Sequence, residues 1–122
     1  MPFTIGLLAD RPDLIDALAE AYRLQWPSWY GPGGRGDAVA DLTARAQRGR
    51  IPLGLVAIED GAAIGTCALT EESMSRSGDF GAWLVGLWVA PERRRQGLGL
   101  ELIRAAVMQL SLIHISEPTR PY

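Results

Sequence analysis

The alternation of apolar and polar residues predicts, in chain order, a strand, two helices, three strands and a last helix. The run from Pro2 to Leu8 is short and apolar, as strands are, and apolar residues then recur at helical spacing between Leu14 and Tyr22. We expect Asp10 to cap this first helix, because a carboxylate accepts hydrogen bonds from the free N–H groups of a first turn. The helix should end near Trp26-Pro27, because proline disfavours helical geometry in the residue before it.

A glycine-rich loop over residues 30–36 separates this helix from a second one, for which Asp37 is the expected cap. The nearly continuous apolar run from Ile51 to Ile58 is typical of a strand that is covered on both faces. Asp60-Gly61 then favours a hairpin turn, because both residue types tolerate positive φ angles. The next strand is expected from about Ala63 to Leu69.

The polar stretch from Glu71 to Gly81 predicts a loop, and Trp83 to Val89 predicts a further strand. The last helix is expected from near Gly97 to about Gln109, with apolar residues at helical spacing on one face. The sequence has no internal repeat, and 122 residues fit one domain.

The composition narrows the chemistry that this domain can perform. All twelve basic residues are arginine, which excludes a P-loop or Schiff-base lysine and suggests a GC-rich genome. The single Cys67 and the single His114 cannot form a disulfide framework or a Cys/His zinc site, and we expect no metal. The net charge of −2 gives no global attraction to nucleic acid. No apolar run is long enough for a membrane span and no signal-peptide pattern is present, so we expect a soluble, cytoplasmic domain.

Residues 110–122 do not continue the helical pattern, and we expect them to be foreign to the natural protein. The stretch from Leu110 to Arg120 resembles the in-frame translation of the transposase adapter used in sequencing libraries. Such a scar carries no information about the fold, so His114 and Tyr122 are not candidate catalytic groups. Residues 1–109 are then the N-terminal two-thirds of the natural domain. We expect the chain to fold weakly and to show no turnover, because the strands and the helix that would complete the sheet edge are missing. The alternative is a natural short final strand.

The segment from Leu87 to Gly99 carries the clearest chemistry. It runs from a strand through a loop into a helix start, and a helix N-terminus presents unpaired N–H groups and partial positive charge to an anion. Gly97 and Gly99 lack Cβ atoms, so a phosphate can approach the backbone closely. The run Arg93–Arg95 adds fixed positive charge at the same end. A solvated arginine cluster at a helix start is the alternative, but it would not explain both glycines.

Two known phosphate cradles do not fit, because the dinucleotide fingerprint needs a glycine where Leu102 stands and a P-loop needs a lysine. The run Arg94-Arg95-Gln96-Gly97-Leu98-Gly99, preceded by Val89-Ala90-Pro91, instead resembles the acetyl-CoA-binding motif Arg/Gln-x-x-Gly-x-Gly/Ala of the GCN5-related N-acetyltransferase (GNAT) superfamily. The element order is also similar to the first two-thirds of that fold. The resemblance implies an α/β fold of the α+β type, with a mixed, mostly antiparallel sheet and flanking helices, incomplete at the C-terminus.

The same resemblance implies the partners and the residues that hold them. Acetyl-CoA is the expected cosubstrate and an amine of a small molecule or peptide the acceptor. A homodimer is compatible with the family, whereas neither nucleic acid nor a membrane is an expected partner. In the family motif, the backbone N–H groups from Arg95 to Gly99 hold the CoA pyrophosphate, which implicates Arg94, Arg95, Gln96, Gly97, Leu98 and Gly99. The backbone of Leu87, Trp88 and Val89 is expected to pair with the pantetheine arm.

The sequence assigns no catalytic residue. In the family, a base that is often a glutamate acting through water takes the amine proton, and a tyrosine commonly protonates the thiolate. The stretch from Trp83 to Val89 has no carboxylate where many relatives carry one, and the tyrosine is expected beyond Gln109. Glu71, Glu72 and Asp79 are the nearest acids, each expected to be a solvated loop charge. The missing carboxylate keeps a second interpretation open, a non-catalytic acyl-CoA-binding regulatory module.

Trp26, Trp29 and Tyr30 are candidate acceptor-binding residues. In GNAT enzymes the segment between the first two helices often walls the acceptor site, and aromatic faces attract an ammonium group. The alternative is that the two tryptophans only cover the edge of the core. Cys67 lies in an apolar strand and is expected to be a small core residue rather than a nucleophile. A nucleic-acid contact through Arg93–Arg95 is a third interpretation, which the acidic composition disfavours.

Overall fold

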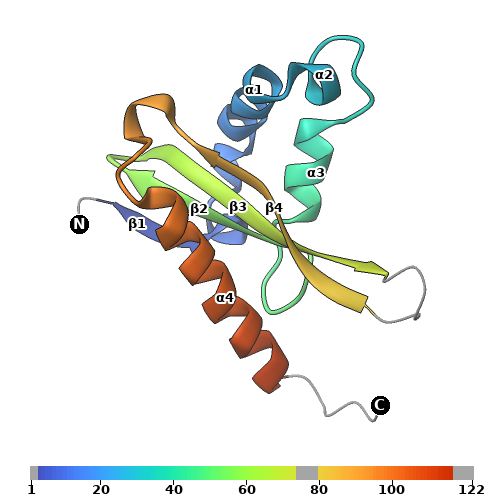
Figure 1. Cartoon of the computed structure of the whole chain (residues 1–122), viewed down its shortest axis with the longest axis vertical. Coiled ribbons are helices and arrows are strands. Elements are labelled where there is room, and N and C mark those ends of the chain that lie inside the picture. The colour runs from blue at the N-terminus through green and yellow to red at the C-terminus, as the bar shows by residue number, and fades with distance from the viewer. Residues whose placement is uncertain (1–2, 74–79, 117–122) are drawn as a thin grey trace.

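A sheet of four antiparallel strands, in the order β1-β2-β3-β4, forms the centre of the fold (Figure 1). The computed structural model describes residues 3–73 and 80–116. Its strands and helices are β1 (Thr4–Leu7), α1 (Ile15–Gln25), α2 (Pro27–Tyr30), α3 (Ala38–Ala44), β2 (Leu53–Glu59), β3 (Ala62–Ser73), β4 (Phe80–Val89) and α4 (Leu98–Ser116). Short 3-10 turns lie at Leu8–Asp10, Pro12–Leu14 and Pro91–Arg93. The predicted order of elements is confirmed, and α2 is an additional short helix between the two predicted ones.

Helices cover both faces of the sheet. α1, α2 and α3 lie on one face and α4 lies on the other (Figure 1). Leu18, Leu42 and Val56 belong to the buried cluster between α1, α3 and the sheet, whereas Leu55 and Leu102 belong to the cluster under α4. Each long helix therefore buries an apolar stripe against the sheet, in a layered α+β architecture.

β2 and β3 form the hairpin that the sequence predicts. Asp60 and Gly61 have positive φ angles of 52° and 79°, and the pairing of Glu59 with Ala62 closes a two-residue turn. A turn of this kind matches the right-handed twist of the two strands that it joins. β2 thereby becomes a central strand, with β1 on its other side.

The predicted caps of the first two helices have different outcomes. The Asp37 carboxylate accepts a hydrogen bond of 3.1 Å from the backbone N–H of Ala40, so this cap of α3 is confirmed. The expected cap at Asp10 is wrong, because two 3-10 turns precede α1 and the helix begins only at Ile15. Asp10 ends the first of these turns and forms an ion pair with Arg48 instead.

The hairpin of β3 and β4 is longer than the sequence predicts. The expected loop from Glu71 to Gly81 is wrong at both ends, since residues 71–73 continue β3 and residues 80–81 begin β4. Glu71 pairs with Ala82 and Ser73 pairs with Phe80. Backbone pairing extends the ladder here although residues 71–73 are polar, because the hydrogen bonds of the ladder join main-chain groups of the two strands. Asp79 lies outside the described residues.

α4 continues beyond its predicted end near Gln109 and extends to Ser116. The expectation that the helical pattern stops at Leu110 is wrong, because Ile113 is 3% exposed and packs in the cluster under the sheet. Ile113 follows Ala106 by two turns, so the two side chains share one helix face. The foreign origin of residues 110–122 stays a prediction. Among the described helices, none combines the length and the apolar character needed to cross a membrane.

Candidate functional site

β4 is an edge strand with a break in its regular pairing. It pairs with β3 on one side, and no strand within residues 3–73 and 80–116 pairs with its other side. The register of β3 and β4 shifts between Thr66 and Ala68, so that one residue of β3 faces two residues of β4, Gly86 and Leu87. This arrangement is a β-bulge, which bends a strand and redirects its backbone groups.

The bulge is tied to helix α1 by one hydrogen bond. The Tyr22 hydroxyl donates to the carbonyl oxygen of Gly86 at 2.7 Å. Gly86 has a φ of 61°, and a Cβ there would lie 2.4 Å from the Tyr22 hydroxyl oxygen. Burial raises the pKa of Tyr22 to about 12, although the charge of Arg45 opposes the shift. Tyr22 therefore stays protonated and remains a hydrogen-bond donor at neutral pH.

The loop between β4 and α4 leaves a run of backbone donors free. A 3-10 turn at Pro91–Arg93 is followed by positive φ angles of 66° at Arg95 and 83° at Gly97, before α4 begins at Leu98. In the described part of the chain, none of the backbone N–H groups of residues 95–100 donates to a carbonyl oxygen, and the first such bond is from Glu101 to Gly97. Free N–H groups and the helix dipole together make this loop an anion-binding surface.

The two glycines of the loop leave open space beside these donors. A Cβ at Gly97 would meet no atom within 4 Å. A Cβ at Gly99 would reach only the side chains of Val89 and Leu87, at 3.9 and 4.0 Å. The backbone can thus be approached closely at both positions, and the start of α4 adjoins the end of β4. Leu98 is buried, so only its backbone faces this surface.

The three arginines of the loop have different partners. Arg93 forms an ion pair with a glutamate at the end of β2. Arg94 donates from Nε to the carbonyl oxygen of Val89 at 2.9 Å and from Nη2 to Oε1 of Gln25 at 2.7 Å. Arg95 is exposed, and its side chain has no hydrogen bond or ion pair to the described residues. Arg95 is therefore the arginine available to an anion, whereas Arg94 fixes the loop against α1.

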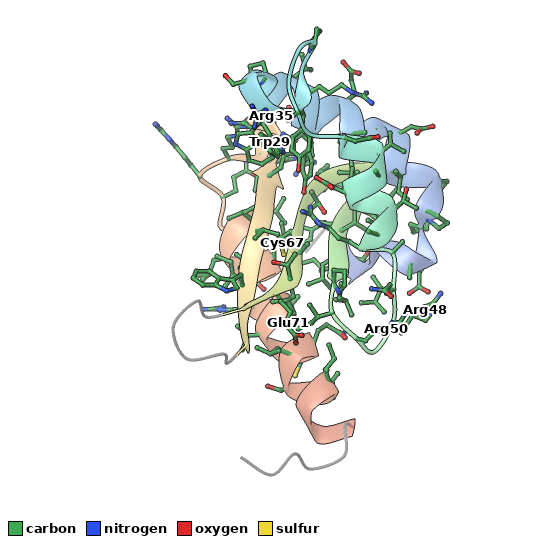
Figure 2. All side chains as sticks on the ribbon, turned by 90° about the vertical axis from the view of Figure 1, so that its right-hand side faces the viewer. Trp29, Arg35, Arg48, Arg50, Cys67 and Glu71 are labelled. Carbon is green, nitrogen blue, oxygen red and sulfur yellow. The ribbon has the colours of Figure 1, made fainter. Side chains whose placement is uncertain are left out.

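The aromatic residues predicted beside the acceptor lie between α1 and the glycine-rich loop. Tyr30 stacks on Tyr22 with ring centroids 5.4 Å apart, and Trp26 meets Tyr22 edge-on at 5.0 Å. Trp29 lies farther out, close to Gly36, and is 52% exposed. Figure 2 shows Trp29 and Arg35 together at this end of the molecule. Trp26 and Tyr30 thus pack at the core edge, and Trp29 presents an accessible ring.

A cavity of about 430 Å³ lies between α3, the segment before β2, and β3. Its polar lining consists of Asp41, Arg45, Thr70 and Glu71. Asp41 accepts a hydrogen bond of 2.7 Å from the Tyr30 hydroxyl. The sequence analysis did not single out Asp41 or Arg45, although their spacing of four residues on one helix was a usable signal. Glu71 is labelled in Figure 2.

The sequence profile of the Acetyltransferase (GNAT) family matches residues 17–112. The chain belongs to this family. No curated protein matches it.

Solved GNAT structures share the fold at low sequence identity. An aminoglycoside 6'-N-acetyltransferase complexed with coenzyme A superposes with a TM-score of 0.69 at 19% identity, over 91% of this chain and 57% of that one. An aminoglycoside 6'-acetyltransferase type Ii superposes with a TM-score of 0.69 at 20% sequence identity, over 91% of this chain and 66% of that one. The GNAT family N-acetyltransferase YhbS from Escherichia coli, in complex with CoA, superposes with a TM-score of 0.65 at 24% sequence identity, over 95% of this chain and 59% of that one. The chain thus spans less than two thirds of the length of these three proteins.

The edge strand β4 and the loop after it contain the residues that the sequence motif of this family singles out. The predicted residues Leu87–Val89 and Arg94–Gly99 lie together at the end of β4 and the start of α4. β4 carries no carboxylate at any of its ten positions, Phe80–Val89. Trp26, Trp29 and Tyr30 lie on the opposite face of the sheet from α4, at the end of α1.

Cys67 takes no part in this surface. It is fully buried, and its Sγ lies 3.6 Å from the carbonyl oxygen of Leu102, to which it can donate. Burial raises the pKa of the thiol to about 12, so it stays protonated and inert. The predicted core role of Cys67 is confirmed. Among the residues that the structure describes, no group of three His, Cys, Asp or Glu side chains is placed to hold a metal ion.

Proposed function

We propose that this chain binds acetyl-CoA at the open edge of β4 and the start of α4, and that the protein transfers the acetyl group to an amine of a small molecule or peptide. The observation that carries the proposal is the run of free backbone N–H groups from residue 95 to residue 100, at the end of an edge strand. Membership of the GNAT family supports the CoA pyrophosphate as the ligand of these donors.

Each part of the surface has a separate task in this proposal. The N–H groups of Arg95 to Gly99 bind the pyrophosphate, and the exposed Arg95 guanidinium adds positive charge. Arg94 keeps the loop in place through its hydrogen bonds to the Val89 carbonyl and the Gln25 side chain. No described strand pairs with the open edge of β4, so the backbone of Leu87, Trp88 and Val89 is the edge proposed to pair with the pantetheine arm, as it would with an added strand. The Val89 carbonyl on this segment also accepts from Arg94.

The reaction forms a C–N bond to the acetyl carbon and breaks its C–S bond, while the amine loses a proton and the thiolate gains one. Bound acetyl-CoA supplies the activated acyl group. In this proposal the residues of this chain hold it beside the Gly86–Leu87 bulge. The groups that move the two protons are not assigned, because β4 has no carboxylate.

A non-catalytic acyl-CoA-binding module is the second candidate function. It is favoured by the same absence of a carboxylate from β4. An assay for released CoA thiol distinguishes the acetyltransferase from the non-catalytic module. The assay uses the protein encoded at the source locus, acetyl-CoA and a broad panel of amines. Thiol release with any amine supports the acetyltransferase, and binding without release supports the module.

Calorimetric titration of the chain with CoA tests the shared part of both candidates. Gly99→Val adds a branched side chain beside the free N–H groups, where the fold has room for it. We expect it to weaken CoA binding about tenfold or more. Gly6→Val is the matched control, because a Cβ at Gly6 on β1 meets no atom within 4 Å and the fold has room for it there too. Equal CoA affinity in wild type and Gly99→Val would contradict the proposal.

Several expectations about the whole protein, beyond CoA binding and acetyl transfer, are tested by no observation so far. A cytoplasmic location, a bacterial source, a homodimer and the absence of nucleic-acid and membrane partners stay predictions. The foreign origin of residues 110–122 is tested by amplifying the source locus and sequencing the codons after Gln109. Codons that differ from those for Leu110 to Arg120 would support it, and identical codons followed by a stop would overturn it.

A further inference from the structure

A cluster of charged groups on the α1–α3 face of the sheet is not used by the CoA surface. It lines the cavity of about 430 Å³ between α3, the segment before β2, and β3. The cavity adjoins β4, because the lining residue Thr70 pairs with Trp83 of β4, whose side chain is 47% exposed. A ligand in this cavity therefore lies next to β4 at the register of Trp83, four residues before Leu87, where the proposed acyl-donor segment begins.

The charges of the cavity do not neutralise one another. Asp41 and Arg45 are four residues apart on α3 and its C-cap, a spacing at which acidic and basic side chains commonly pair. Among the described residues, however, Arg45 has no ion pair with either Asp41 or Glu71. Both carboxylates of the cavity thus remain available to a cation.

The contacts of Asp41 and Arg45 explain why they stay apart. Tyr30 donates to Oδ2 of Asp41, which orients the carboxylate and leaves its other oxygen without a partner in the described part. Arg45 turns toward the bulge, where its Nη1 lies 3.1 Å from the position of a Cβ on Gly86. This Nη1 atom is buried and has no hydrogen-bond partner in the described structure. Arg45 lies close to the Tyr22 and Tyr30 hydroxyls, and its charge opposes the burial that raises their pKa values. Because Nη1 still makes no hydrogen bond of good geometry, an oxygen of a ligand or a water would satisfy a buried donor that is costly to leave unmade.

We propose that this cavity is the acceptor site and that it selects an amine that bears a nearby oxygen. Asp41 binds the ammonium group, and Arg45 donates to a hydroxyl or carbonyl oxygen of the same molecule. This inference rests on the proposed function, because it places the acceptor next to the acyl donor. Asp41 is assigned a binding role, so no proton transfer is attributed to it.

Three ligands of similar size and shape test the selection. trans-2-Aminocyclohexanol carries both groups, cyclohexylamine only the amine, and cyclohexane-1,2-diol only oxygens. Each is titrated into the isotope-labelled 122-residue chain, with and without saturating CoA, while amide resonances are followed by NMR. We expect the amino alcohol to shift resonances around Asp41, Arg45 and Thr70. The amine should bind severalfold more weakly and the diol about tenfold more weakly.

Variants assign the two contacts. Asp41→Asn should weaken binding of the amino alcohol about tenfold, because a charge-assisted contact becomes a neutral one. Asp60→Asn makes the same change in charge at the exposed β2–β3 turn and should leave binding unchanged. Arg45→Met should abolish the preference for the amino alcohol over the amine. A urea unfolding curve of each variant checks that it is folded. If Asp41→Asn is not folded, the site is tested by Arg45→Met and by the comparison of the three ligands in the wild-type chain.

The outcomes separate this inference from the proposed function. CoA affinity is measured in the same samples and should not change in Asp41→Asn. Loss of CoA binding in the wild-type chain overturns the proposed function. CoA binding without a response to the amino alcohol, or equal amine binding by wild type and Asp41→Asn, overturns the acceptor site alone.

Discussion

The hydroxyl oxygen of Tyr22 lies 2.7 Å from the carbonyl oxygen of Gly86, which follows it by 64 residues in the sequence. This hydrogen bond joins α1 to the bulge of β4 and fixes the direction of one peptide group there. Tyr30, a candidate acceptor residue on α2, stacks on the same Tyr22 ring. Tyr22 therefore links α2 to β4, the strand that is proposed to hold the acyl donor. The two halves of the candidate site therefore share one side chain.

Gly86→Ala should destabilise the fold by about 2 kcal/mol or more. A non-glycine residue is strained at a φ of 61°, and its Cβ would collide with the Tyr22 hydroxyl. Urea unfolding measures the loss. Tyr22→Phe alone should cost about 1 kcal/mol, the net value of one hydrogen bond. The double variant should be less destabilised than the sum of the two single ones, because removal of the hydroxyl relieves the collision. Strict additivity would show that the two groups do not meet.

The stability of the fold should fall as the pH rises above about 9. Burial raises the pKa values of Tyr22 and Cys67, each to about 12. In the unfolded chain both groups lose their protons at lower pH, near their ordinary pKa values of about 10 and 8.5. Their contribution is thus complete below those values and is lost as the pH rises toward 12. Urea unfolding at several pH values between 7.5 and 11 measures this loss. Cys67→Ala should show a shallower decline, and an unchanged slope would contradict the assigned burial.

Ile113→Ala should destabilise the chain by about 2–4 kcal/mol, as expected for loss of a buried isoleucine side chain. Ile113 is 3% exposed, whereas the adjacent Leu112 is 50% exposed. Leu112→Ala is therefore the matched control and should change the free energy of unfolding by less than about 0.5 kcal/mol. Equal effects of the two substitutions would show that α4 does not pack through this turn in solution.

Local features of this fold were predictable from the sequence, and contacts between distant residues were not. The Asp60-Gly61 turn and the Asp37 cap follow from backbone preferences of a few neighbouring residues. The polar residues of β3 at its outer end gave no strand signal, because pairing with β4 rather than side-chain pattern extends them. Asp10 failed as a cap because two 3-10 turns intervene before α1.

In the candidate site, too, the features set by neighbouring residues were predictable and the contacts between distant residues were not. The glycines and arginines from Arg94 to Gly99 form a contiguous motif, so the sequence located that surface. It did not show that Arg94 donates to Gln25, or that the Arg95 side chain has no partner among the described residues. Asp41 and Arg45 were missed because their importance depends on Tyr30 and Gly86, which the fold brings to them.

The most direct test of the central claim is the response of individual backbone amides to CoA. The isotope-labelled chain is titrated with CoA, and the amide resonances of residues 95–100 are followed by NMR. The account predicts that these resonances shift together, with those of Leu87 to Val89, while amides of β1 and of the β2–β3 turn stay unchanged. CoA binding that leaves residues 95–100 unmoved, or no binding at all, would contradict it.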